Sequence, residues 1–294
     1  MKCKFPRFLK AIEPWLWLSP CLCLITMFVY YPFVKTIINS LFTVDYAGKI
    51  RNFVGCKNYI QLFSDHLFLT AIKNTVIFTA ITVPSSIFIG GSLALLSRVR
   101  RTLSMVYEAA FSIPCAVSTS AIAMIFQLLL MPSLGLINKL IGINVHWLYD
   151  KRLSLLSLSV IQIWISSGFA FIFVLVALRN IPQDILEAAW IDGAGNLRII
   201  TTILLPLISP TVVYLFIVNT ATSLMMMSLS NILTGGGPMN STLTVIQYTY
   251  QKFISTGNAT ISNSASVVSF SLSLILVFIV WFCYHLNQKD SLHG

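Results

Sequence analysis

Six long stretches of this chain contain no charged side chain, which leaves few folds open to it. They cover residues 15–34, 74–97, 109–138, 153–178, 199–251 and 253–288. An α-helix needs about 20 apolar residues to cross the hydrocarbon core of a membrane. Only 10% of the 294 residues are charged and the mean hydropathy is +0.84. A soluble domain carries about 25% charged residues, so lipid is the expected solvent for most of the chain.

The fifth stretch is too long for one crossing, and the turn-forming residues 234–238 (TGGGP) interrupt it. We therefore predict six transmembrane helices, at about residues 15–38, 71–97, 103–130, 153–178, 204–227 and 264–286. The predicted fold class is an all-α integral membrane protein. It has one transmembrane domain over residues 15–286, with a core from about residue 71, flanked by tails at 1–14 and 287–294.

Positive charge favours a cytoplasmic location for both tails. In that orientation the cytoplasmic segments hold ten Lys and Arg residues and the outer segments seven, and the basic cluster at 98–101 lies directly against its span. Cytoplasmic loops are enriched in Lys and Arg. The net charge of +10 then follows from topology and from contact with anionic membrane lipid. Nucleic-acid binding is not expected, because no soluble basic domain is predicted.

The six cysteines and four histidines are scattered along the chain. Only Cys56 falls in a predicted outer loop, so no disulfide framework is expected. No spacing of Cys and His suits a metal ion. We therefore predict no metal site.

Residues 181–206, between the fourth and fifth spans, form an amphipathic insert. Pro182 suits a first helical turn, and Asp184 and Glu187 follow where acids complement the helix dipole. Gly193 permits a break. The two helices would carry apolar faces formed by Leu186, Ala189 and Trp190, and by Leu197, Ile200, Ile203 and Leu204. We predict a helix–turn–helix on the cytoplasmic surface that enters the fifth span near Pro206; an ordinary interfacial loop is the alternative.

Residues 187–194 read EAAWIDGA, and Leu205-Pro206 and Pro210 follow. The pattern EAA-x-IDGA-x(10)-LP-x(3)-P resembles the EAA loop of permease subunits in bacterial ABC importers. The match is to the sugar and glycerol 3-phosphate branch, which includes the first permease subunit of maltose-type systems. Three further segments resemble this family: FVG with NY at residues 53–59, GLIN at 135–138, and LTGGGP followed by ST at 233–242.

The resemblance implies that the insert is a coupling helix that binds a separate ABC ATPase dimer. The coupling residues would be Glu187, Ala188, Ala189, Asp192, Gly193, Ala194 and Pro206. Glu187 would pair with a basic group of the ATPase, and the two alanines would permit close seating. Asp192 would cap or brace the turn, with Arg198 as a candidate partner. ATP would be bound by the partner, so this chain would be no enzyme and need no cofactor; its LTGGGP lacks the Lys-Ser/Thr of a phosphate loop.

Five uncharged polar side chains and one methionine inside the spans are candidates for a substrate path. They are Gln162, Ser166, Asn219, Thr222, Ser223 and Met226. Such groups suit hydroxyl-rich solutes, but hydrogen bonding between helices is the alternative. The resemblance also implies that an extracytoplasmic solute-binding protein faces the turn formed by Gly235, Gly236, Gly237 and Pro238. Because six spans are too few for a two-fold path, a second permease subunit is expected.

The hypothesis is therefore half of an ATP-driven import path for a sugar, an oligosaccharide or glycerol 3-phosphate. The alternative is a stand-alone secondary transporter or channel, which would need a charged residue within the membrane for ion coupling. Lys35, Lys73 and Glu108 are the candidates, and all lie near span ends. A membrane-anchored scaffold would usually carry a soluble domain. Leu197 and Ile200 replace aromatic residues of the family, and 225–227 (MMM) also departs from its pattern, which leaves the solute open.

Overall fold

The computed structural model describes residues 7–45, 48–98 and 104–292, and the side chains within residues 14–286 of these ranges. Arg100 and Arg101 of the basic cluster, and the ends of both predicted tails, lie outside the described residues. The chain divides into two compact units. One contains the residues up to Ser64 together with Thr249–Val268, and the other contains Asp65–Tyr248 together with the residues from Ser269 onward.

Five helical segments of the described chain are long and apolar enough to cross a membrane. They are α1 (Arg7–Ile25) with η1 (Thr26–Tyr30) and α2 (Tyr31–Ser40); α4 (His66–Ser97); α8 (Ser154–Arg179); α10 (Asn196–Arg198) with η2 (Ile199–Leu204) and α11 (Leu205–Leu224); and α14 (Ala259–Leu292). Five of the predicted spans overlap these segments over most of their length, although the segments at the first and fifth spans begin eight residues earlier than predicted. The all-α membrane fold is therefore confirmed, with the addition of one small hairpin described below.

The third predicted span is broken rather than straight. The prediction of one helix over residues 103–130 is wrong, because α5 (Ser104–Ala116) and α6 (Thr119–Leu129) meet at 99°. Pro114 removes a backbone donor from the last turn of α5. The side chain of Ser118 then caps α6 by accepting a hydrogen bond from the backbone nitrogen of Ala121 at 3.3 Å. The pair can still serve as one span with a bend, which makes six candidates.

Two spans contain a π-helical turn, and each turn ends two residues before a proline. The first, η1, precedes Pro32, and the second, η2, precedes Pro206. A proline inside a helix has no N–H to donate, and its ring clashes with the carbonyl four residues earlier. In a π-helical turn each N–H bonds to the carbonyl five residues earlier instead of four, so the turn is wider and the hydrogen-bond pattern before the proline changes. The two π-helical turns thus accompany Pro32 and Pro206, whereas α4 continues through Pro84 without such a turn.

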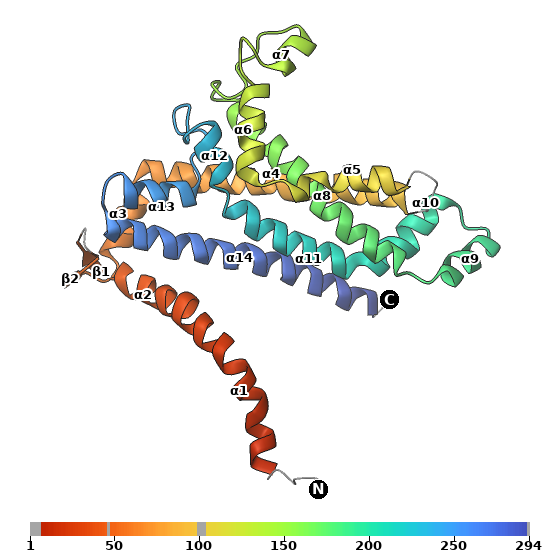
Figure 1. Ribbon diagram of the computed structural model, residues 1–294, viewed down its shortest axis with the longest axis horizontal. Helices are drawn as coiled ribbons and strands as arrows, with labels where there is room; N and C mark the ends of the chain where they lie inside the picture. Colours follow the sequence, from red (N-terminus) through yellow and green to blue (C-terminus); the bar gives the residue numbers. More distant parts are fainter. Residues whose placement is uncertain (1–6, 46–47, 99–103, 293–294) are drawn as a thin grey trace. The chain divides into compact units, whose positions relative to one another are not determined.

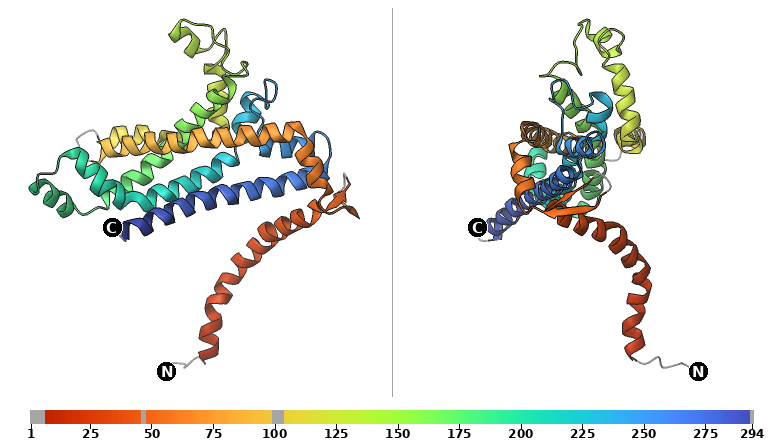
Figure 2. Two further views of the ribbon diagram at one scale, coloured as in Figure 1. Left: turned by 180° about the vertical axis from the view of Figure 1, so that it is seen from behind. Right: turned by 90° about the vertical axis from the view of Figure 1, so that its left-hand side faces the viewer.

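The second unit is built on α4, α8 and α11, which contact one another side by side (Figures 1 and 2). Their shared apolar core includes Phe171, Leu204 and Leu215, all essentially inaccessible. Gly90 of α4 lies directly against α8: a Cβ atom there would be 2.5 Å from the carbonyl oxygen of Ser167 and 2.8 Å from the backbone nitrogen of Phe171. Only glycine permits this approach.

Replacing Gly90 by alanine should therefore lower the free energy of unfolding by about 3 kcal/mol, because the helix backbones must separate. At Gly91, the next residue of the same helix, no described atom lies within 4 Å of an added Cβ atom apart from the adjoining residues and the backbone of the same helix. Gly91→Ala is the matched control and should be neutral or slightly stabilising. Thermal unfolding in detergent measures both. Equal shifts for the two variants would contradict this account of the α4–α8 contact.

A second apolar cluster of this unit lies under α6 and α12 (Ser228–Leu233). Phe78, Ile122, Leu158 and Leu229 form its buried centre. The short helix α7 (Leu136–Ile141) follows α6, and α13 (Val245–Ile254) follows the glycine-rich turn. Figures 1 and 2 show α12 and the α9–α10 segment at opposite ends of the α4–α8–α11 bundle. The glycine-rich turn and the predicted insert therefore lie far apart.

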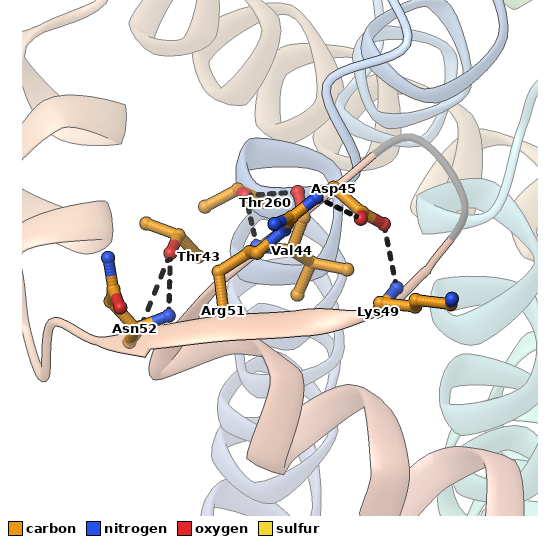
Figure 3. A network of polar contacts seen from close by, with 7 residues as sticks. All are labelled: Thr43, Val44, Asp45, Lys49, Arg51, Asn52 and Thr260. Carbon is orange, nitrogen blue, oxygen red and sulfur yellow. Dashed lines mark hydrogen bonds and ion pairs between the residues drawn. The ribbon is translucent and has the colours of Figure 1, made fainter.

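The first unit contains a β-hairpin that the sequence patterns did not predict. Strands β1 (Phe42–Val44) and β2 (Ile50–Phe53) pair antiparallel. Asp45 binds the side chain of Arg51 at 3.0 Å and the backbone nitrogen of Lys49 at 2.9 Å, which closes the hairpin (Figure 3). The Thr260 hydroxyl accepts from the Val44 nitrogen and donates to the Val44 carbonyl. The first turn of α14 thus caps β1. A short helix, α3 (Lys57–Ser64), completes this region.

Candidate functional site

The insert between α8 and α11 contains one regular helix, α9 (Gln183–Ile191). Pro182 is its N-cap residue, with ψ of 137°, rather than part of the first turn as predicted. The acidic side chain of Asp184 lies in the first turn, where it complements the helix dipole. The second predicted helix is α10, which passes through η2 directly into α11. The helix–turn–helix arrangement is therefore present.

The turn after α9 is a Schellman motif, and it explains why the sequence reads Asp-Gly-Ala. The backbone nitrogen of Ala194 donates to the carbonyl of Ala189 at 2.9 Å, and that of Gly193 donates to Trp190 at 3.0 Å. Gly193 has φ of +76°, the left-handed conformation that glycine adopts without strain. Ala194, the next residue, is half-buried. The glycine thus ends α9 and turns the chain back toward the bundle.

The insert has a buried side and an exposed apolar side. Ala189 is 7% exposed, and Ile199 and Leu204 are fully buried in the core of the bundle. On the other side, Ile191 is 86% exposed and Leu197 is 75% exposed. The predicted apolar face of the second helix is therefore wrong at Leu197. The π-helical turn after α10 changes the angular spacing of side chains, so the face that is buried includes Ile199 instead.

The predicted coupling residues divide between these two sides. The exposed ones are Glu187, Ala188, Asp192, Gly193 and Pro206, whereas Ala189 faces the core of its own chain. Ala189 packs against its own chain, so Ala188 is the alanine of the pair that is exposed to a partner. In the described part of the chain the ion pairs are Arg51–Asp45 and Arg179–Glu108. Asp192 thus does not brace the turn against Arg198.

An ion pair lies at the point where α8 leads into the insert. Arg179, the last residue of α8, binds both carboxylate oxygens of Glu108 in α5, at 3.0 Å and 2.5 Å. It also reaches the carbonyl of Ser97 at the end of α4, at 3.5 Å. A cavity of about 420 Å³ separates this pair from α9, with Gln183 and Trp190 in its lining. The two charges stand 71 positions apart in the sequence, which gives no signal that they meet.

The candidate path residues in α8 and α11 mostly bind within the chain. Asn219 donates to the hydroxyl of Ser86 at 3.3 Å, and Ser223 lies 3.1 Å from the hydroxyl of Thr82, so both join α11 to α4. Gln162 donates to Ser166 within α8 at 3.0 Å. Met226 lies beyond the end of α11, in the apolar cluster under α12. Thr222 is the exposed member of the set.

The glycine-rich turn is tied into a buried polar network. The Thr242 hydroxyl donates to the carbonyl of Gly237 at 2.8 Å and lies 2.6 Å from the hydroxyl of Thr234. Ser230 contacts both the Thr242 carbonyl and the side chain of Gln247. Gly235 is exposed, Gly236 is buried, and Gly237 and Pro238 are half-buried. The four predicted binding-protein-facing residues therefore form a fixed structure with only part of it accessible.

A buried tyrosine joins α13 to the start of α4. The hydroxyl of Tyr248 donates to the carboxylate of Asp65 at 2.7 Å, and Asp65 also caps α4 by accepting from the nitrogen of Leu67. Burial, and next this hydrogen bond, raise the pKa of the Tyr248 phenol above its ordinary range. The group therefore stays neutral and keeps the contact over the whole physiological pH range. It stabilises the same end of the bundle as the glycine-rich turn.

Comparison with known proteins agrees with this arrangement. Residues 82–289 match the family model described as the inner membrane component of binding-protein-dependent transport systems. The chain is 30% identical over 262 residues to the sulfoquinovosyl glycerol transport system permease SmoG of Agrobacterium fabrum, covering 87% of this chain and 85% of that protein. It is 30% identical over 276 residues to the sn-glycerol-3-phosphate transport system permease UgpA of Yersinia pestis, covering 92% of both.

The fold also matches that of a solved importer. A chain of the bacterial alginate ABC transporter, in complex with an alginate-pentasaccharide-bound periplasmic protein, superposes with a TM-score of 0.81. The alignment covers 94% of this chain and 96% of that one at 23% identity, so it shows the fold alone. The predicted resemblance is thereby confirmed. Since the family model covers most of the chain and relatives at 30% identity cover nearly all of it, the chain belongs to the inner-membrane permease components of binding-protein-dependent ABC transporters.

Proposed function

We propose that this permease forms half of the import path for a sugar, an oligosaccharide or glycerol 3-phosphate, and that a separate ATPase dimer drives it by binding residues 181–206. The related permeases named above belong to transport systems for sulfoquinovosyl glycerol and sn-glycerol 3-phosphate. The observation that carries the coupling role is the two-sided insert. Its buried side is fixed in the core, while Ile191 and Leu197 present apolar surface outward.

An exposed apolar surface flanked by charge is typical of a protein–protein contact. Ile191 and Leu197 have the acidic side chains of Glu187 and Asp192 close to them in sequence, all exposed. A matching groove on the ATPase would combine an apolar floor with basic groups at its rim. When the ATPase dimer closes on ATP, force applied to this surface would pass through Ala189, Ile199 and Leu204 to the spans. ATP itself would bind only to the partner.

The remaining partners are proposed from the six expected crossings. With six crossings, the two tails and the insert would lie on one side of the membrane, which we assign to the cytoplasm. The glycine-rich turn would then face the outer side, where a solute-binding protein would deliver the solute. A second permease would complete the path. Thr222 is the candidate that can meet a solute directly, while Asn219 and Ser223 would do so only after α11 moves from α4.

Purification of the full chain from its native membranes in mild detergent tests this assignment. Mass spectrometry should find one ATPase and one companion permease in the purified complex. Reconstituted alone, without nucleotide or the other subunits, the chain should not transport any solute. Transport by the isolated chain without nucleotide would instead establish the stand-alone transporter.

Substitution of Gly193 tests the role of the turn after α9 separately from the rest of the insert. Gly193→Val places a β-branched residue at φ of +76°, which costs about 1–2 kcal/mol and displaces α9. We expect loss of most ATPase co-purification while the chain still enters the membrane. Gly195→Val is the matched control, because φ there is −70° and none of the described atoms lies within 4 Å of an added Cβ. Normal ATPase binding by both variants would rule out a role for this turn in coupling.

A further inference from the structure

A groove of about 630 Å³ runs along α4 at the end of the bundle opposite the insert. It begins at His66 in the first turn of α4 and extends along the same helical face to Ile81. Residues preceding and opening α8 also line it, together with Met239 and Ser241 after the glycine-rich turn. Small-molecule sites have volumes of about 300–1,000 Å³. The groove therefore has the size of a site for a sugar or a glycerol derivative.

Among the described residues, three permanent cations and no acidic residue line this groove. The cations are Lys73 of α4 and the adjacent Lys151 and Arg152, all exposed. Neither of the two ion pairs in the described part of the chain involves them. The nearby Asp150 carboxylate accepts from the backbone nitrogen of Arg152 at 2.7 Å, not from its guanidinium. Like charges at one site disfavour one another unless an anion joins them.

The groove lies at the starts of two long helices. α4, with 32 residues, begins at His66, and α8, with 26, begins at Ser154. The first turn of an α-helix carries a partial positive charge. Acidic residues offset part of it here, because Asp65 binds the first-turn N–H groups of α4 and Asp150 precedes α8. The positive potential of the groove therefore comes mainly from the two lysines and the arginine.

Hydrogen bonds fix the groove in shape. The side-chain nitrogen of Asn74 donates to the carbonyls of Asn240 and Leu243, at 2.8 Å and 3.1 Å, and so holds the loop against α4. The hydroxyls of Ser154 and Ser241 lie 2.8 Å apart and hold the same loop against α8. Apolar side chains such as Ile77, Ile81 and Leu155 form the remaining wall. A wall of this kind suits the C–H faces of a carbohydrate.

We propose that this basic groove binds the anionic group of the transported solute, namely a phosphate, sulfonate or carboxylate on a sugar-sized or glycerol-sized molecule. The proposal rests on the proposed function and narrows its substrate class from sugars in general to acidic ones. Lys73, Lys151 and Arg152 would hold the anion at the outer entrance of the path. The headgroup of an anionic lipid presents the same phosphate chemistry, so the experiment must separate these two sources.

The test uses the assembled transporter in nanodiscs of phosphatidylcholine, with the thermal unfolding midpoint as the measurement. Two matched pairs serve as probes: glycerol 3-phosphate against glycerol, and glucuronate against glucose. At least one anion should raise the midpoint when its uncharged counterpart does not. The double variant Lys73→Gln/Arg152→Gln should weaken that response about tenfold or more in concentration. Lys139→Gln, which removes a charge of α7 outside the groove, should leave it unchanged.

Two outcomes overturn the proposal. If neither anion acts beyond its uncharged counterpart, or if the double variant responds like the unmodified transporter, the groove is no solute site. If nanodiscs containing phosphatidylglycerol stabilise the unmodified transporter but not the double variant, and the soluble anions have no effect, the occupant is a lipid headgroup. Co-purification of the ATPase and the companion permease is independent of these results. The proposal that the groove binds the solute can therefore be disproved while the proposed coupling function stands.

Discussion

Ile191→Asp is expected to abolish ATP-driven transport while leaving the permease folded in the membrane. Ile191 is 86% exposed at the end of α9, so its replacement should change the free energy of unfolding by no more than about 0.5 kcal/mol. In the proposed complex the same side chain is buried against the ATPase. An uncompensated carboxylate buried there costs about 3–5 kcal/mol, which corresponds to an affinity at least about a hundredfold lower.

Two controls separate charge from position. Ile191→Asn keeps a polar side chain of similar size without the charge, and its effect on ATPase binding should be smaller. Asn196→Asp adds the same charge at the first residue of α10, where the helix dipole favours it. Quantitative co-purification of the ATPase and the thermal unfolding midpoint are measured for all three. If Ile191→Asp retains full ATPase binding, the apolar surface of the insert is not the contact.

The spans and the family were predictable because their signals are local in the sequence. Long charge-free stretches identify a membrane helix without knowledge of its neighbours. The segments that resemble the family contain residues whose side chains bind nearby backbone. Asn58 donates to the carbonyls of Ser40 and Phe42, at 2.8 Å and 3.1 Å. Asn138 likewise donates to Pro132 and Val145, both at 2.9 Å. Such residues fix loops, which is a physical reason for their presence in these patterns.

The faces of the insert could not be predicted, because they depend on backbone geometry. The helical spacing of Leu197, Ile200, Ile203 and Leu204 is real, yet the π-helical turn over residues 199–204 turns Leu197 outward. The break between α5 and α6 also escapes the sequence patterns, although Pro114 and Ser118 mark it. Prolines are common in membrane helices, so a single proline does not distinguish a bent span from a straight one.

Contacts between distant residues are beyond the reach of the sequence patterns. The sequence gives no sign that three cations meet. It shows Lys73, Lys151 and Arg152 only as positive charges that influence membrane topology or lie near the ends of spans. Their convergence on one groove depends on the packing of α4 against α8, which no local pattern encodes. Glu108 likewise stands in the sequence as a lone acid and a candidate for ion coupling. The structure pairs it with Arg179, so in this conformation its charge is already neutralised by a permanent cation.

Glu108→Gln should destabilise the permease by about 1–3 kcal/mol, because this ion pair is only partly buried. The side chains of Arg179 and Glu108 are only 25% and 21% exposed, and the buried Arg179 Nε atom has no hydrogen-bond partner among the described residues. Removing the carboxylate leaves a desolvated guanidinium without its counter-ion. Arg179→Gln should have a similar cost for the opposite charge. Thermal unfolding in detergent gives both values.

A double-mutant cycle tests whether the pair acts as a unit. Glu108→Gln/Arg179→Gln removes both charges together, so it should cost less than either single substitution. The pair also joins α5, α8 and the end of α4 at the base of the insert. Both single variants should therefore lower ATP-driven transport more than ATPase binding, because the docked insert would move without the spans. Additive losses of stability, or equal losses of transport and binding, would assign the ion pair no part in force transmission.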